Sequence, residues 1–481
     1  MKRTINVVAV ALVLAAVGCG STGPTGPIAK TADGKAVKDG TGNAVSVEAA
    51  NKFKAGLEAI SQNDKSNGWN EGSCTSTAQL FLDAAKEQGD KTFAEAIYNA
   101  GLAYQRCKKH TEAKGYFQQT LQKNPKFHQA RVQMALYGFA DSGEKNVDQA
   151  ISELQQAVKD AEFKNVEAFV NLAMMQMRRA GTASDSDGPN DFERAKRNVQ
   201  RALAVDDGFM PAFNQLAIYY LETAKQKAGR DAKKKIATNA GKEKKVDSQA
   251  LELAALVCSQ AIRKNPNYAP IHNTAGMIQV ELGNLNGAVG EFNTARRLDP
   301  SFFEAQMNFA AVNLQFRGFQ QAEEAYRAAL KMKPSDFDAH LGLALALRGQ
   351  IDDSNFDKMV AAAAAELDAA KKISPERPET YYNEAILTQE YKAKSGGKDS
   401  EASLLAAKGL FGQFVSKAGP AKEFEDAVKR SKERMGEIDQ IIAFNKQTEA
   451  DRKASELEQR QKEAEAEAKT GEEGDKKGEG Q

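Results

Sequence analysis

Cysteine is the residue type in this sequence best suited to covalent chemistry, and the first of its four cysteines has an informative position. Cys19 directly follows Gly18, at the end of an apolar run over residues 5–17 that Lys2 and Arg3 precede. The run is about as long as the apolar region of a signal peptide and is too short to span a bilayer as a stable helix. A thiol at this point can act as the nucleophile that forms a thioether, and the small residue before it would fit a signal peptidase.

The other three cysteines, Cys74, Cys107 and Cys258, would meet an oxidising compartment after export, so a disulfide must be considered. If residues 75–87 and 94–108 form an antiparallel helical hairpin, Cys74 and Cys107 each lie about sixteen residues from the centre of its turn, at the same axial height. We therefore predict a Cys74–Cys107 disulfide, with two unpaired thiols as the alternative. We expect Cys258 to be buried and to pack as a small hydrophobic group.

Histidine and glycine positions give no support for catalysis. The four histidines lack the spacing of metal ligands, and the sequence GGKD at residues 396–399 lacks two of the features of a phosphate-binding loop. The formal net charge is +1, from 66 basic and 65 acidic residues, so no global field draws the chain to nucleic acid. We therefore expect a protein that is not an enzyme and has no metal, no cofactor, no small-molecule substrate and no nucleic-acid partner.

The residues Ala16-Val17-Gly18-Cys19 resemble the lipobox of bacterial lipoproteins. The resemblance implies a signal peptide over residues 1–18, a diacylglyceryl group on the Cys19 thiol, and an acylated N-terminus whose palmitate-type chains anchor the protein. By the sorting rule of such lipoproteins, Gly20 in place of Asp implies the outer membrane, at its periplasmic face. An ordinary secretory signal with an incidental cysteine is the alternative. We expect residues 19–46, rich in Gly, Pro, Thr and Lys, to be a flexible tether.

A repeat of about 34 residues is the most informative pattern in the chain. Residues 269–302 and 303–336 show it best, because small, aromatic and proline residues recur at matching positions. The pairs are Gly276 with Ala310, Ala288 with Ala322, Ala295 with Ala329, Phe292 with Tyr326, and Pro300 with Pro334. Small residues let two helices approach closely, the aromatic residue fills the gap to the next unit, and the proline ends the second helix. His272 and His340 share one repeat position, where we expect packing rather than catalysis.

The repeat extends over residues 94–419 and predicts about eight helical hairpins there. Its period is that of the tetratricopeptide repeat, so we predict an all-α fold, a right-handed superhelical solenoid in which neighbouring hairpins stack. We expect N-terminal capping helices over residues 47–93, a charged C-terminal capping helix over residues 420–448, and a charged disordered tail over residues 449–481.

In stacked repeats the first helix of each hairpin lines the concave surface, and the residues on that stripe are unusually apolar here. Methionine on such a stripe is flexible and suits an adaptable peptide groove. We predict the partner groove at Val132, Leu136, Phe139, Val170, Met174, Met177, Met307, Leu314, Leu341 and Leu345. Tight superhelical packing that buries these residues is the alternative.

A basic segment from Lys225 to Asp247 is a second candidate surface, because it carries nine basic residues against three acidic ones. We expect a long loop between two helices, which could contact an anionic wall, lipid headgroups or an acidic partner. The residues proposed for that contact are Lys233, Lys234, Lys235, Lys242, Lys244 and Lys245. A merely solvated run of charge is the alternative.

The lipobox-like residues, the stretch from Cys74 to Cys107 and the repeats beyond it together resemble envelope tetratricopeptide lipoproteins of Gram-negative bacteria, in particular those of the myxobacterial adventurous gliding-motility machinery. The resemblance implies a membrane-anchored scaffold that binds periplasmic and outer-membrane proteins of an envelope-spanning machine. A lipoprotein of the pilotin or outer-membrane-assembly type is the alternative. An enzyme acting on peptidoglycan has no catalytic constellation to support it.

Overall fold

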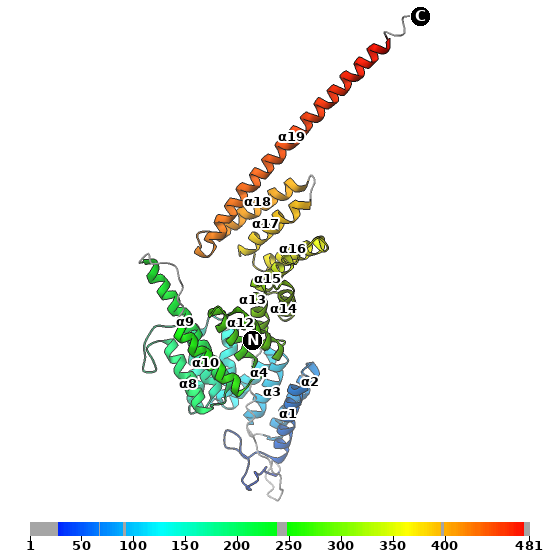
Figure 1. Cartoon of the computed structure of the whole chain (residues 1–481). Helices are drawn as coiled ribbons and strands as arrows, with labels where there is room; N and C mark the ends of the chain where they lie inside the picture. The colour runs from blue at the N-terminus through cyan, green and yellow to red at the C-terminus, as the bar shows by residue number, and fades with distance from the viewer. Residues whose placement is uncertain (1–26, 67, 90–92, 238–247, 396–398, 476–481) are drawn as a thin grey trace. The chain divides into compact units, whose positions relative to one another are not determined.

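The computed structural model describes residues 27–475 except 67, 90–92, 238–247 and 396–398 (Figure 1). The chain divides after Asn284 into two compact units, here called the N-terminal unit and the C-terminal unit. Both are built from α-helices, and over the described residues the only extended pairing is a few isolated β-bridges. None of the helices in this part of the chain combines the length and the apolar character that crossing a bilayer requires. The all-α prediction is confirmed.

Helices that follow one another in the N-terminal unit pack side by side as hairpins, α1 on α2, α3 on α4, and so on to α9 on α10. Their bounds are α1 Val47–Ser66, α2 Glu71–Glu87, α3 Ala94–Arg106, α4 His110–Lys123, α5 His128–Asp141, α6 Val147–Asp160, α7 Val166–Arg179, α8 Asp191–Val205, α9 Met210–Ala237, α10 Ser248–Lys264 and α11 Ala269–Glu281.

The C-terminal unit continues the same arrangement, with hairpins α13–α14, α15–α16 and α17–α18 and with α19 packed on α18. The bounds are α12 Leu285–Leu298, α13 Phe303–Gln315, α14 Phe319–Met332, α15 Phe337–Arg348, α16 Phe356–Ile373, α17 Glu379–Glu390, α18 Asp399–Ala418 and α19 Glu425–Asp475, with short 3₁₀ turns at Lys392–Ser395 and Lys422–Phe424.

Glycine allows the helices of the first two hairpins to approach closely. A Cβ atom added to Gly101 on α3 would lie 2.7 Å from the ring of Phe117 on α4. One added to Gly56 on α1 would lie equally close to Phe81 on α2. The α1–α2 pair, predicted as a simple cap, therefore uses the same glycine–aromatic contact as the α3–α4 repeat and is a further hairpin of the array.

Consecutive hairpins are joined by a recurring hydrogen bond. The carbonyl of the proline that follows the second helix accepts a hydrogen bond from the side chain six residues later, on the next helix. The pairs are Arg131 with Pro125 (2.7 Å), His272 with Pro266 (2.9 Å), Gln306 with Pro300 (3.2 Å), His340 with Pro334 (2.9 Å) and Tyr381 with Pro375 (2.9 Å). His272 and His340 thus satisfy a backbone carbonyl that the end of a helix leaves without a partner.

The predicted tether is wrong for residues 27–46, which form an ordered segment that we call the N-terminal module. Ala29, Val37 and Val45 lie eight residues apart and are joined in a closed ring of backbone hydrogen bonds, Ala29 N to Val45 O, Val37 N to Ala29 O and Val45 N to Val37 O, of 2.8–2.9 Å. Their side chains are at most 3% exposed and belong to the core of α1, α2 and α3. Three small apolar side chains are enough to anchor the segment, because the hydrogen-bonded ring places all three against the same core.

Two side chains attach the N-terminal module to the helices. The Gln88 amide accepts a hydrogen bond from Ser46 N (3.0 Å) and donates one to Ala44 O (2.7 Å). The carboxylate of Glu95, at the start of α3, accepts a hydrogen bond from Gly40 N at 2.5 Å. The module is therefore held at the turn between α2 and α3 by contacts that a flexible tether would not form.

Two further boundaries differ from the prediction. The expected loop from Lys225 is helical as far as Ala237, because α9 continues through a stretch rich in Ala, Lys, Gln and Arg, which are strong helix formers. The expected disordered tail from Glu449 is helical as far as Asp475, as the unbroken ribbon of α19 shows (Figure 1). Ion pairs four residues apart, such as Glu449 with Lys453, support α19 in this stretch.

The inserted loop between α7 and α8 is fixed by a buried aspartate. Asp191, the first residue of α8, is fully buried and accepts hydrogen bonds from Arg179 (2.7 Å), Arg194 (2.6 Å) and Gly181 N (2.7 Å). Burial alone would raise the pKa of Asp191, but these donors outweigh it and lower that pKa to about 2. The end of α7 is therefore held in a defined position.

Candidate partner-binding surfaces

The first helices of the hairpins carry the residues predicted to form the groove. In the N-terminal unit α5 contacts α7, α7 contacts α9, and α9 contacts α11. In the C-terminal unit α13 contacts α15, and α15 contacts α17. Each unit therefore has a continuous face built from first helices, and the ten predicted residues lie on α5, α7, α13 and α15.

The groove prediction is wrong for α5. Val132, Leu136 and Phe139 are 0, 2 and 7% exposed and belong to a core that extends from α5 to α9. The guanidinium of Arg178, at the end of α7, lies 5.3 Å from the centre of the Phe139 ring. These side chains fill the space between neighbouring helices, so tight packing, the alternative interpretation, holds at this position.

On α7 the predicted residues Val170, Met174 and Met177 are half-buried and pack on the edge of the same core. Ile218 on α9 and Met277 on α11 take the same helix position as Met174 and are also half-buried. We call these five residues the N-terminal strip. The sequence prediction omitted Ile218 and Met277, although the repeat register extended to α9 and α11 finds them.

Polar groups interrupt the face on either side of the N-terminal strip. The Gln215 amide on α9 donates a hydrogen bond to the sulfur of Met177 at 3.1 Å, and Thr274 on α11 donates one to Asn214 on α9 at 2.7 Å. These contacts connect α7, α9 and α11 through side chains. The apolar residues of the strip therefore lie on three helices whose spacing is fixed by side-chain hydrogen bonds.

The C-terminal unit has a corresponding surface. Met307 and Leu314 on α13 and Leu341 and Leu345 on α15 are all half-buried. Tyr382 on α17 is half-buried at the position equivalent to Met307 and Leu341, and its ring packs against Phe414 with a centroid distance of 5.1 Å. We call Met307, Leu314, Leu341, Leu345 and Tyr382 the C-terminal strip.

A hollow of about 520 Å³ lies elsewhere in the N-terminal unit, between α4, α5 and α6. Leu121, Met134 and Phe139 contribute apolar atoms to it, and a Cβ atom added to Gly138 would meet nothing within 4 Å. Sequence analysis did not find this hollow. Gly138 is the one sequence signal for the hollow. It lines the hollow, has no side chain to fill it, and is not one of the small residues that the repeat requires.

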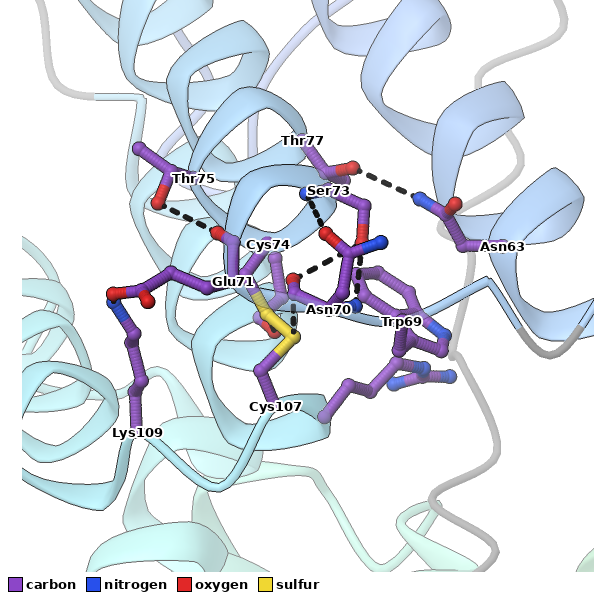
Figure 2. Close-up of a disulfide and its surroundings, with 12 residues drawn as sticks. Asn63, Trp69, Asn70, Glu71, Ser73, Cys74, Thr75, Thr77, Cys107 and Lys109 are labelled. Atoms are coloured by element: carbon purple, nitrogen blue, oxygen red, sulfur yellow. Dashed lines mark hydrogen bonds and ion pairs between the residues drawn. A yellow bond between two sulfur atoms is a disulfide. The ribbon is translucent and has the colours of Figure 1, made fainter.

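The structure joins Cys74 and Cys107 in a disulfide, with Cα atoms 6.2 Å apart (Figure 2). Cys74 lies in the first turn of α2, which Asn70 caps by accepting a hydrogen bond from Ser73 N at 3.0 Å. Cys107 follows the last residue of α3. The bond therefore links the start of one helix to the end of the next, at the axial height that the hairpin geometry requires.

A polar cluster beside the disulfide ties α1 to the same place. Asp64, near the end of α1, accepts hydrogen bonds from Trp69 Nε1 (2.7 Å) and from Arg106 at the end of α3 (2.7 and 2.9 Å). Burial acts to raise the pKa of Asp64, but the hydrogen bonds from Arg106 and Trp69 outweigh it, and the pKa is lowered. The Glu71–Lys109 ion pair (2.7 Å) adds a link between α2 and α4. Three helices thus meet at one fastened point.

Some predicted residues cannot be placed. Cys19 and the basic residues Lys242, Lys244 and Lys245 lie outside the described residues. Lys233, Lys234 and Lys235 fall on α9, but their side chains are outside the described part. Cys258 is buried, 2% exposed, in the core of α9, α10 and α11.

The described residues contain no cluster of three or more His, Cys, Asp or Glu side chains that could hold a metal ion. The histidines have structural contacts instead. His340 lies 2.6 Å from Glu366 as well as contacting Pro334, and His128 lies 2.8 Å from Asn165, with a pKa lowered by burial.

Comparison with known proteins finds tetratricopeptide-repeat family models that match residues 94–127 and 309–378. The first match has the bounds of the first hairpin predicted from the 34-residue spacing. No curated protein matches the chain.

Several solved structures of low sequence identity are similar to parts of the chain. A tetratricopeptide protein of Thermus thermophilus is 22% identical, covering 46% of this chain and 99% of its own, with a TM-score of 0.37. A tetratricopeptide repeat protein of Parabacteroides merdae is 15% identical, covering 63% and 98%, with a TM-score of 0.36. PilF of Pseudomonas aeruginosa is 16% identical, covering 56% and 97%, with a TM-score of 0.37.

The two family matches fall on α3–α4 in one unit and on α13–α16 in the other, where the glycine–aromatic contacts and the proline-terminated helices are found. Each unit is a solenoid of consecutive helical hairpins with the tetratricopeptide-repeat fold.

Proposed function

We propose that this chain is a lipid-anchored scaffold that binds segments of other envelope proteins along the N-terminal and C-terminal strips. The observation that carries the proposal is the repetition of half-buried apolar side chains at equivalent positions of successive first helices. Packing inside a solenoid has no need to leave such residues accessible, whereas a partner segment can bury them.

The chemistry of the strips favours a peptide partner. The N-terminal strip contains three methionines among five residues, and methionine adapts its shape to different apolar side chains. Tetratricopeptide repeats are protein-binding modules, and an amphipathic helix or an extended segment with apolar anchors fits a surface of this kind. The partner would present apolar residues spaced to meet adjacent first helices.

The location in this proposal comes from the sequence. The lipobox-like residues ending at Cys19 support an acylated N-terminus, and Gly20 supports sorting to the periplasmic face of the outer membrane. The resemblance to gliding-motility lipoproteins supports a place in that envelope-spanning machine, with periplasmic and outer-membrane subunits as partners. The competing role is assembly of outer-membrane proteins.

Paired substitutions test the strips. Met174→Gln with Met177→Gln and Leu341→Gln with Leu345→Gln replace half-buried side chains without creating large cavities. Each pair should reduce crosslinked recovery of a partner from membranes by about ten-fold or more, as expected for central residues of an interface. Leu256→Gln is the matched control, because Leu256 is 52% exposed on α10, outside both strips.

The proposal fails for a strip if its paired variant recovers the same partners as the unaltered chain while keeping its unfolding temperature. Deletion of the whole protein separates the two roles. Loss of single-cell movement with normal outer-membrane protein levels supports gliding, and depletion of outer-membrane barrels supports assembly instead.

A further inference from the structure

The N-terminal module presents a distinct outward face. Ala29, Val37 and Val45 point into the core of α1, α2 and α3, and successive residues of an extended chain point in opposite directions. The residues beside Ala29 and Val37 in the sequence therefore point away from the helices. Consistent with this geometry, the residues Ile28, Lys30, Ala36 and Lys38 are all exposed, and Ile28 is 41% exposed.

The charge of this outward face is positive. Residues 27–46 contain three lysines and two aspartates as their only charged side chains. Asp39 is 8% exposed, and its carboxylate accepts hydrogen bonds from Thr41 N (2.9 Å) and Asn43 N (2.8 Å), so it is turned into its own loop. Asp33 forms an ion pair with Lys35 at 2.9 Å. Lys30 and Lys38 remain as the charge that the face offers to a partner.

The chain length before the module limits how far this face can lie from an anchored N-terminus. Val47 N, at the start of α1, donates a hydrogen bond to Pro27 O at 2.8 Å, so the module is attached to α1 at Pro27. Cys19 precedes Pro27 by only eight residues. Eight residues reach at most about 28 Å when fully extended, which is less than the thickness of a bilayer with its headgroups.

The module cannot rotate freely on the helices behind it. Gln88 and Glu95 hold it at the turn between α2 and α3, and the Cys74–Cys107 disulfide joins those two helices at their other ends. Any surface that the module touches therefore sets the direction of α1, α2 and α3 as well.

We infer that the outward face of the N-terminal module, with Lys30, Lys38 and Ile28, rests on the anionic headgroup surface of the membrane in which Cys19 is anchored. This inference rests on the proposed lipid anchor. Lys30 and Lys38 attract anionic headgroups over a short range, and Ile28 enters the interfacial layer. The acyl chains hold the protein at the membrane, and the module fixes the orientation in which the first hairpins stand on it.

Lysine acetylation measured by mass spectrometry tests this surface. The chain from Gly20 onward is attached through an N-terminal polyhistidine tag to vesicles that contain nickel-chelating lipid, with phosphatidylglycerol either added or omitted. This design supplies its own anchor, so it is independent of whether Cys19 is acylated. Acetylation of Lys30 and Lys38 should slow about five-fold on the anionic vesicles, and high salt should abolish the difference.

Lys126, between α4 and α5, and Lys159, on α6, are exposed; they serve as internal controls in the same sample and should show no change. The inference is overturned if all four lysines react equally, or if the neutral vesicles slow Lys30 and Lys38 as much as the anionic ones do. Lys35 lies in the same module, so its acetylation should also slow on the anionic vesicles. In Lys30→Glu with Lys38→Glu, acetylation of Lys35 should return to its rate on neutral vesicles. The matched pair Lys126→Glu with Lys159→Glu should leave Lys35 slow.

The anchor and the strips have separate readouts. Labelling with radioactive palmitate, compared between the natural chain and Cys19→Ser, tests the lipid anchor. The strip variants test partner binding. Failure of the acetylation experiment with successful palmitate labelling would therefore reject the headgroup contact alone.

Discussion

The two ends of the helical array are closed in different ways. At the N-terminal end α1, α2 and α3 are connected by a disulfide, by the Asp64–Arg106–Trp69 cluster and by the N-terminal module. At the C-terminal end α19 packs on α18 through Ile438, which is fully buried, and Ile442, which is 9% exposed. Residues 443–464 of α19 are all exposed.

The difference shows what each end is built to do. A solenoid must cover the apolar face of its last hairpin, and one amphipathic helix is sufficient for this purpose, as the first part of α19 shows. The N-terminal end has a disulfide and the packed N-terminal module beyond that requirement, which suits an end that must keep a fixed position. The rest of α19 extends about 50 Å past its last buried residue.

The largest effect should follow from breaking the C-terminal end, because Ile438, a fully buried apolar side chain, lies at the centre of the packing of α19 on α18. Ile438→Ala removes a fully buried side chain between α18 and α19 and should cost about 2–5 kcal/mol locally. Hydrogen exchange should speed up in α18 and α19, with α1 to α3 unchanged. Equal exchange in α19 of the variant and the natural chain would show that packing on α18 does not hold this helix.

Breaking the N-terminal end should lower the free energy of unfolding by slightly less. Removing the disulfide with Cys74→Ser and Cys107→Ser frees a loop with a sequence separation of 33 and should destabilise α1–α3 by about 3 kcal/mol. The Asp64 cluster and the module should still keep these helices folded. Denaturant unfolding followed at Trp69 measures the change, and Cys258→Ala controls for thiol loss elsewhere. An unchanged midpoint would mean that the polar contacts alone fasten this end.

A smaller effect on stability is expected at Glu95, whose carboxylate holds the N-terminal module. Burial raises the pKa of Glu95, and the nearby Asp39 charge adds to this rise. The raised value means that stability from Glu95 is present below the unfolded pKa and is lost as pH rises through the folded pKa. Glu95→Gln keeps an acceptor for Gly40 N, so it should be equally stable or up to about 1 kcal/mol more stable at pH 7. A loss of stability at pH 7 would show that the charged carboxylate is required.

The smallest effect is expected on the exposed half of α19. Phe444 and Leu457 are 70% and 60% exposed, so Phe444→Gln and Leu457→Gln should change the free energy of unfolding by less than about 0.5 kcal/mol. Calorimetry on the full chain checks this expectation. A drop of several degrees in unfolding temperature would mean that these residues are buried against another molecule of the chain.

The repeat made most of the fold predictable. Ala295, Ala322 and Ala329 are fully buried where the spacing placed them, because the helix crossing in every repeat requires small residues. The Cys74–Cys107 pairing followed from helix geometry, since equal distances from a turn fix equal heights.

Three features were not predictable with the patterns used. The N-terminal module buries only Ala29, Val37 and Val45, too few residues for a composition argument, although their eight-residue spacing and the Asp-Gly pairs at residues 33 and 39 are turn and repeat signals. The burial of Phe139 depends on Arg178 from another helix, which no local pattern contains. The helical stretches after Lys225 and Glu449 followed intrinsic propensity, where charge density had favoured a loop and a tail.

The central claim is that the apolar strips on the first helices are the partner-binding surface. Photo-crosslinking in living cells tests it most directly, with a benzophenone amino acid placed at Met174 or Leu345 and, as a control, at Leu256 on α10. The account predicts adducts with envelope proteins from the two strip positions and none of those adducts from Leu256. The absence of adducts at both strip positions, or the same adducts from Leu256, would contradict it.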